Sequence, residues 1–150
     1  MAEIAAREVS PEVSAAVLAE CLDTFPHVRL TVTGESMRPA LRPGEIVLLA
    51  RPALRPPRLG DVVLFQHPEG LRLHRLVWGP PLAARSWRTK GDLSRSCDPR
   101  ISPRDVLGTV IAVEGRSRPG GHVGPALRSL ARLLVDRLWP ARKAGRPAPA

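Results

Sequence analysis

Residues 28–39 read VRLTVTGESMRP, and this stretch indicates the fold class. Its first six residues alternate between apolar and polar side chains, which is the spacing of a half-buried strand. The alternation stops at Gly34, where the backbone is free to turn sharply, and the hydroxyl of Ser36 follows. The stretch therefore predicts a strand that runs directly into a turn carrying a serine.

Similar short strands are predicted downstream, and turn residues such as RPG, PP, HPEG and GPP separate them. The candidates cover residues 46–50, 61–66, 71–78, 86–90 and 106–114. Many short strands divided by turns are typical of an all-β domain. The sequence thus predicts a mainly β fold built of coiled sheet.

A helix is expected on each side of this β domain. Ser10 and Pro11 form a helix start, and apolar residues follow at helical spacing, which predicts a helix over about 10–23. Residues 126–139 place leucines on one helical face and arginines nearer the other, which predicts a basic amphipathic helix. That helix is expected either to dock on the domain or to lie on a membrane surface.

These patterns divide the chain into three parts. Residues 1–26 are an N-terminal helical segment, and residues 27–115 are the β domain. Residues 116–150 are a basic segment with a linker, the amphipathic helix and a disordered tail.

Composition narrows the function classes. The formal net charge is +9, and the basic C-terminal segment favours anionic partners. With three Trp, two Phe and no Tyr, none clustered, no specific nucleic acid is expected as a partner. The two cysteines form neither a metal set nor a disulfide framework, so neither a metal nor another cofactor is expected. No apolar stretch reaches the length of a membrane span, and no signal peptide is visible, which indicates a cytoplasmic protein or one peripheral to the membrane.

A serine hydroxyl needs a neighbouring base to become a nucleophile, and histidine is the usual base. Of the four histidines, His74 alone lies inside a confident strand prediction. A strand histidine is more often structural, and a serine between Gly and Pro is usually only a turn residue. Composition and spacing therefore leave Ser36 and His74 as candidates only.

Several boxes in fixed order resemble the signal peptidase I and LexA-like serine peptidase superfamily. The first is GESMRP at 34–39, continued by LRPGEIVL at 41–48, and it resembles the nucleophile box. The later boxes are LGDVVLF at 59–65, LHRLV at 73–77, TKGD at 89–92, SCDPR at 96–100 and VLGTV at 106–110. The histidine in LHRLV and the TKGD box are similar to the endoplasmic-reticulum and archaeal-type signal peptidases, a Ser-His branch. The resemblance covers about residues 28–114 and implies the coiled β-sheet of that superfamily.

The resemblance implies a serine endopeptidase with Ser36 as nucleophile and His74 as general base. Asp98 is the first choice for the group that orients the imidazole, and Asp92 is the second; an ion pair with Arg100 is the structural alternative for Asp98. Ser96 is expected to hydrogen-bond near the base.

Backbone N–H groups near Ser36 are expected to hold the oxyanion, and Gly34 and Met37 to border the oxyanion or substrate-binding site. The chain also departs from the family. Gly34 stands where a serine often supplies a side-chain donor, unless Thr33 replaces it, and Leu93 stands where the branch has Asn.

The expected partner is a peptide or preprotein substrate, with peripheral membrane contact through 126–139. Two alternatives stay open. One is a LexA-like self-cleaving regulator, which residues 1–35 disfavour because they lack an Ala-Gly or Cys-Gly cleavage site. The other is a catalytically inactive peptidase fold that binds a protein.

Overall fold

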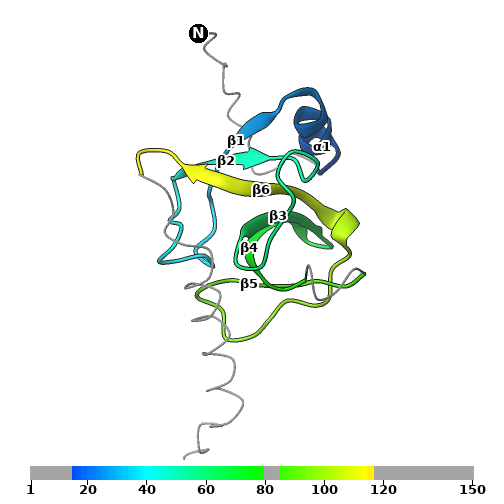
Figure 1. The fold of residues 1–150 in the computed structure, drawn as a ribbon. Helices are drawn as coiled ribbons and strands as arrows, with labels where there is room; N and C mark the ends of the chain where they lie inside the picture. The colour runs from blue at the N-terminus through cyan, green and yellow to red at the C-terminus, as the bar shows by residue number, and fades with distance from the viewer. Residues whose placement is uncertain (1–14, 80–84, 117–150) are drawn as a thin grey trace, which may run out of the picture.

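The computed structural model describes residues 15–79 and 85–116, which form a mainly β fold with one α-helix (Figure 1). The elements are α1 (Ala15–Thr24), β1 (His27–Thr31), β2 (Ile46–Ala50), β3 (Val62–His67), β4 (Gly70–Trp78), β5 (Arg88–Lys90), the 3₁₀ turn η1 (Pro103–Asp105) and β6 (Val106–Val113). No helix within these residues is long and apolar enough to cross a membrane.

The six strands form one antiparallel sheet in the order β1-β2-β6-β3-β4-β5. The last strand, β6, lies between β2 and β3 and therefore joins the two halves of the sheet. Register shifts interrupt the β2–β6, β3–β6 and β4–β5 pairings. Such irregularities increase the local twist of a strand pair, and this lets a single sheet coil.

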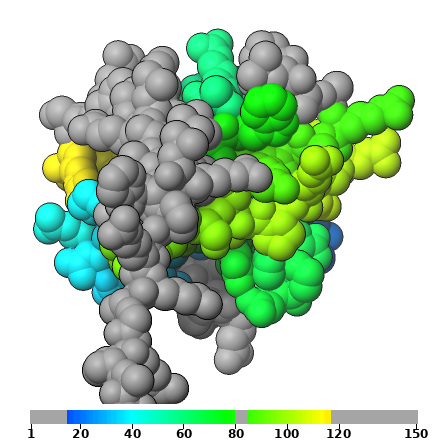
Figure 2. Space-filling model, turned by 90° about the horizontal axis from the view of Figure 1, so that it is seen from below, coloured from blue at the N-terminus to red at the C-terminus, as the bar shows by residue number. Residues whose placement is uncertain are grey.

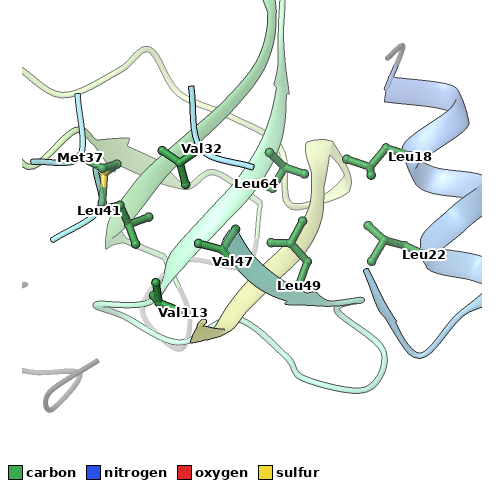
Figure 3. Close-up of a cluster of buried hydrophobic side chains, with 9 residues drawn as sticks. All are labelled: Leu18, Leu22, Val32, Met37, Leu41, Val47, Leu49, Leu64 and Val113. Carbon is green, nitrogen blue, oxygen red and sulfur yellow. The ribbon is translucent and has the colours of Figure 1, made fainter. Parts of the chain in front are cut away.

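Two hydrophobic clusters bury both faces of the central strand β3. On one face Leu18 and Leu22 of α1 point toward Leu49 of β2 and Leu64 of β3 (Figure 3). On the other face Phe65 belongs to a second cluster with residues of β4 and β6. Because successive side chains of a strand point to opposite faces, neighbouring residues of β3 anchor both clusters and fix its register.

The mainly β prediction is confirmed, and most strand boundaries coincide with the predicted ones or differ from them by one residue. The strand predicted over 86–90 is shorter, because only Arg88–Lys90 pair with β4. Trp87 instead forms an isolated antiparallel bridge with Ile101. The predicted helix start at 10–14, the helix at 126–139 and the tail lie outside the described residues.

Candidate active site

Ser36 lies in a turn held at both ends. The backbone of Val32 prolongs β1 by accepting a hydrogen bond from Gly44 (2.7 Å) and donating one to Glu45 (2.8 Å). After Ser36, the N–H of Leu41 donates to the carbonyl of Met37 at 2.9 Å. Met37 is only 2% exposed, so its side chain anchors the turn in the core and leaves Ser36 half-buried at the surface.

His74 lies in β4, opposite Val63 of β3, and its side chain is buried. The ring of Phe65 lies near it, with the two ring centroids 6.1 Å apart. Nε2 of His74 is 3.0 Å from Oγ of Ser36, and Nδ1 is 2.6 Å from Oδ2 of Asp98. The imidazole therefore bridges a hydroxyl and a carboxylate that come from distant parts of the chain.

Asp98 is held from several sides. Its backbone N–H donates to the carbonyl of Thr89 at 2.9 Å, and the hydroxyl of Thr89 donates to Oδ2 at 2.7 Å. On the other carboxylate oxygen, Nη1 of Arg72 lies 3.8 Å from Oδ1. The cation near Asp98 is thus Arg72, and Arg100 makes no ion pair within the described parts of the chain.

These contacts keep the Asp98 carboxylate charged. Burial acts to raise the pKa of Asp98, but hydrogen bonds from His74 and Thr89 and the charges of His74 and Arg72 outweigh it, so the pKa lies below its ordinary value. An ionised carboxylate only accepts hydrogen bonds, which assigns the proton to Nδ1 of His74. In the neutral imidazole, Nε2 then carries the lone pair and faces the hydroxyl of Ser36.

The carboxylate of Asp92 forms an ion pair with Arg75 and does not contact the ring of His74 in the way that Asp98 does. Nε and Nη2 of Arg75 donate to its two oxygens at 2.8 and 2.6 Å, while Nη1 of Arg75 donates to the carbonyl of Gly60 at 2.7 Å. Both side chains are largely buried. This bidentate pair ties the start of the loop after β5 to β4 and to the turn before β3.

The backbone of Gly91 lies directly against Ser36 and His74, and Gly91 was not among the predicted site residues. A Cβ atom at this position would lie 2.6 Å from Oγ of Ser94, 2.9 Å from the carbonyl oxygen of Ser36 and 3.2 Å from Nε2 of His74. The adjoining N–H of Leu93 donates to the Ser36 carbonyl at 2.8 Å. The TKGD box contained Gly91 and Thr89, but their contacts depend on how the loop folds back.

A groove of about 640 Å³ opens beside Ser36 and His74. One wall is formed by residues 30–34, and another by Glu69 together with the first residues of β4, from Gly70 to His74. Ser94, Ser96 and Asp98 contribute the third side. The lining combines leucines with hydroxyl groups, so the groove offers both apolar and hydrogen-bonding surface.

The remaining predicted residues, Gly34, Met37 and Ser96, all line this groove. Gly34 is exposed, and a Cβ atom there would meet nothing within 4 Å. Met37 contributes to the groove from its buried position. Among residues 15–79 and 85–116, no group of three or more His, Cys, Asp or Glu side chains is arranged to hold a metal ion.

The family model described as signal peptidase, peptidase S26, matches residues 7–117. The match includes the whole sheet and all three segments that meet at Ser36. A search among curated proteins found no match.

Proposed function

The chain belongs to the signal peptidase S26 family, and on that premise we propose that it is a serine endopeptidase with Ser36 as nucleophile and His74 as general base. The observation that carries the proposal is the 3.0 Å separation between Oγ of Ser36 and Nε2 of His74. This distance is within the reach that direct proton transfer requires. The buried imidazole supports a fixed geometry for that transfer.

In the proposed reaction, Oγ of Ser36 attacks the carbonyl carbon of the scissile bond while its proton passes to Nε2 of His74. The charged Asp98 stabilises the imidazolium that forms. The imidazolium then protonates the leaving amine, the peptide bond breaks, and an acyl ester remains on Ser36. A water molecule then gives a proton to the same imidazole and attacks the ester. The imidazolium returns this proton to Oγ of Ser36 as the ester bond breaks, which releases the acid product and restores the site.

The negative charge that develops on the attacked carbonyl oxygen needs donors near Ser36. We assign this role to backbone N–H groups of the turn, because Gly34 has no side chain to contribute. Fixed backbone donors need little reorganisation during the reaction, which is why they are effective in this role.

The groove supports a peptide or preprotein as substrate. Its walls are two backbone segments with alternating side chains, and an extended chain that lies between them presents one carbonyl to Ser36. Leucines of β1 and β4 supply apolar contacts for side chains beside that carbonyl.

A proteome-derived peptide library, with cleavage products identified by mass spectrometry, tests the proposal. We expect the full chain to cleave defined bonds and Ser36→Ala and His74→Ala to leave them intact. Ser86→Ala and His27→Ala are matched controls outside the groove and are expected to cleave as the parent does. Equal cleavage by Ser36→Ala would refute the proposal, and a parent that cleaves nothing would favour a binding module.

A further inference from the structure

One wall of the groove also carries exposed arginines. Ser94, Ser96 and Asp98 line the groove, while Arg95 and Arg100 in the same loop are exposed outside it. The residues that follow β5 extend, in yellow-green, over the face seen from below in Figure 2. We define the arginine face as the exposed arginines of this stretch, which are Arg85, Arg88, Arg95, Arg100 and Arg104.

Two members of this face flank a backbone bridge. Trp87 and Ile101 exchange backbone hydrogen bonds of 3.0 Å in an antiparallel arrangement, and both side chains are buried. Arg88 follows Trp87 and Arg100 precedes Ile101, and both arginine side chains are exposed. The bridge therefore brings two cationic positions of the chain close together.

The acidic residues of the same stretch do not offset these charges. Asp92 binds Arg75, Asp98 binds His74, and Asp105 accepts a hydrogen bond from the backbone of Ser102 at 2.8 Å. Within residues 15–79 and 85–116, no arginine of the face makes an ion pair. The outward charge of this stretch is therefore positive throughout.

Arg88 connects the face with the groove wall. Burial raises the pKa of the Cys97 thiol, and the charge of Arg88 and a hydrogen bond from it oppose that rise. Arg88 therefore lies beside Cys97, between the groove-lining Ser96 and Asp98 in sequence. Arg95, in the loop of Ser94, Ser96 and Asp98, and Arg88, beside Cys97, therefore adjoin the residues that form this wall.

We propose that the arginine face binds an acidic segment of the peptide that occupies the groove, so that the substrates are peptides with Asp or Glu near the scissile bond. This inference rests on the proposed function, because it is the groove that places the peptide beside the face. Exposed charges act mainly on association and register, and salt screens them. The preference is thus strongest at low ionic strength.

The test uses the full chain with Ser36→Ala, so that binding is measured without cleavage. The probes are a fluorescein-labelled peptide of alternating Glu and Gly and its Gln-Gly counterpart, followed by fluorescence anisotropy at low and high salt. Arg88→Gln with Arg100→Gln removes the two arginines that flank the Trp87–Ile101 bridge. Arg42→Gln with Arg58→Gln is the matched control, because these arginines are also exposed, make no ion pair within residues 15–79 and 85–116, and lie outside the groove lining.

We expect the Arg88/Arg100 variant to bind the acidic peptide roughly fivefold more weakly at low salt, and the control to change less than about twofold. At high salt the affinities of the Arg88/Arg100 variant and of the control for the acidic peptide should become equal. If both double variants weakened binding of the acidic peptide equally, the binding would depend only on the net charge of the protein. That result would overturn the proposal. Loss of binding to phosphatidylglycerol vesicles, but not to the peptide, would instead assign the face to a lipid surface and also overturn it.

Cleavage profiles separate this inference from the proposed function. With the peptide library, the active parent should enrich acidic residues near the cleaved bonds, and the Arg88/Arg100 variant should lose that enrichment. If the parent cleaves peptides without enriching Asp or Glu near the cleaved bonds, the proposed substrate class is contradicted, but the proposed peptidase function is not. Arginine-dependent binding by a chain that cleaves nothing contradicts the peptidase assignment.

Discussion

Oδ2 of Asp98 lies 2.6 Å from Nδ1 of His74, although 24 positions separate the two residues in the chain. The same oxygen also accepts the hydroxyl hydrogen bond of Thr89 at 2.7 Å. The imidazole is therefore oriented by a carboxylate whose own position is fixed by a strand. Most of the predictions below concern the residues that hold this arrangement.

Replacing Asp98 by Asn should slow cleavage by about 10³-fold, because a neutral amide does not stabilise the imidazolium and favours the wrong tautomer of His74. The fold should remain intact at neutral pH. Steady-state kinetics and circular dichroism measure the two effects. An Asp98→Asn enzyme as fast as the parent would remove Asp98 from the mechanism.

The same substitution should reveal a pH-dependent part of the stability. The pKa of folded Asp98 is lowered, so its contribution is fully present above the value of the unfolded chain and is lost as pH falls through the folded value. In urea unfolding, the gap between the parent and Asp98→Asn should hold from neutral pH down to about pH 5 and narrow below about pH 4. A gap that widens on acidification would contradict the lowered pKa.

Thr89→Val should lower the free energy of unfolding by about 1–3 kcal/mol, because it removes a hydrogen bond from a fully buried hydroxyl to a charged carboxylate while keeping the side-chain shape. The turnover number should fall while KM changes little, since Thr89 acts through Asp98. The acid-side loss of stability should also move to higher pH, because this hydrogen bond lowers the pKa of Asp98. Thr89→Ser is the control and should restore all three quantities.

Gly91→Ala should inactivate the enzyme, because its methyl group would press on the Ser36 carbonyl and on Nε2 of His74. Overpacking of this kind costs about 1–3 kcal/mol, so the variant should fold and yet lose activity. Gly34→Ala is the matched control, since a Cβ there meets nothing within 4 Å. Similar activities for the two variants would mean that the loop yields and that Gly91 does not constrain the site.

Gly34→Ser should raise the turnover number, because the new hydroxyl has room beside the groove and supplies a side-chain donor that Gly34 lacks. Gly34→Ala has the same backbone effect without the donor and should not accelerate cleavage. A Gly34→Ser enzyme no faster than Gly34→Ala would show that backbone donors alone hold the oxyanion.

The sequence was informative where one segment carries the whole signal. The alternation before Gly34 and the regular spacing of turns were sufficient to predict a mainly β fold. Ser36 and His74 became candidates because each lies in a short box of fixed composition. That these two side chains meet in space depends on the pairing of β3 with β4 and of β3 with β6. No single box specifies this pairing.

The sequence could not distinguish the roles of residues whose contacts depend on the path of a loop. Asp92 and Asp98 lie six positions apart after the same strand, and only the fold assigns one to Arg75 and the other to His74. The predicted strand over 86–90 was too long because Trp87 leaves β4 and pairs with Ile101. That pairing also brings the backbone positions of Arg88 and Arg100 to the two sides of one bridge.

The central claim is that Ser36 and His74 act as one unit, and a double-mutant cycle on cleavage rate tests it most directly. Residues that share a single proton transfer have non-additive effects. The account predicts that Ser36→Ala combined with His74→Ala is no slower than either single variant. A double variant slowed by the product of the two single effects would show two independent contributions and contradict the account.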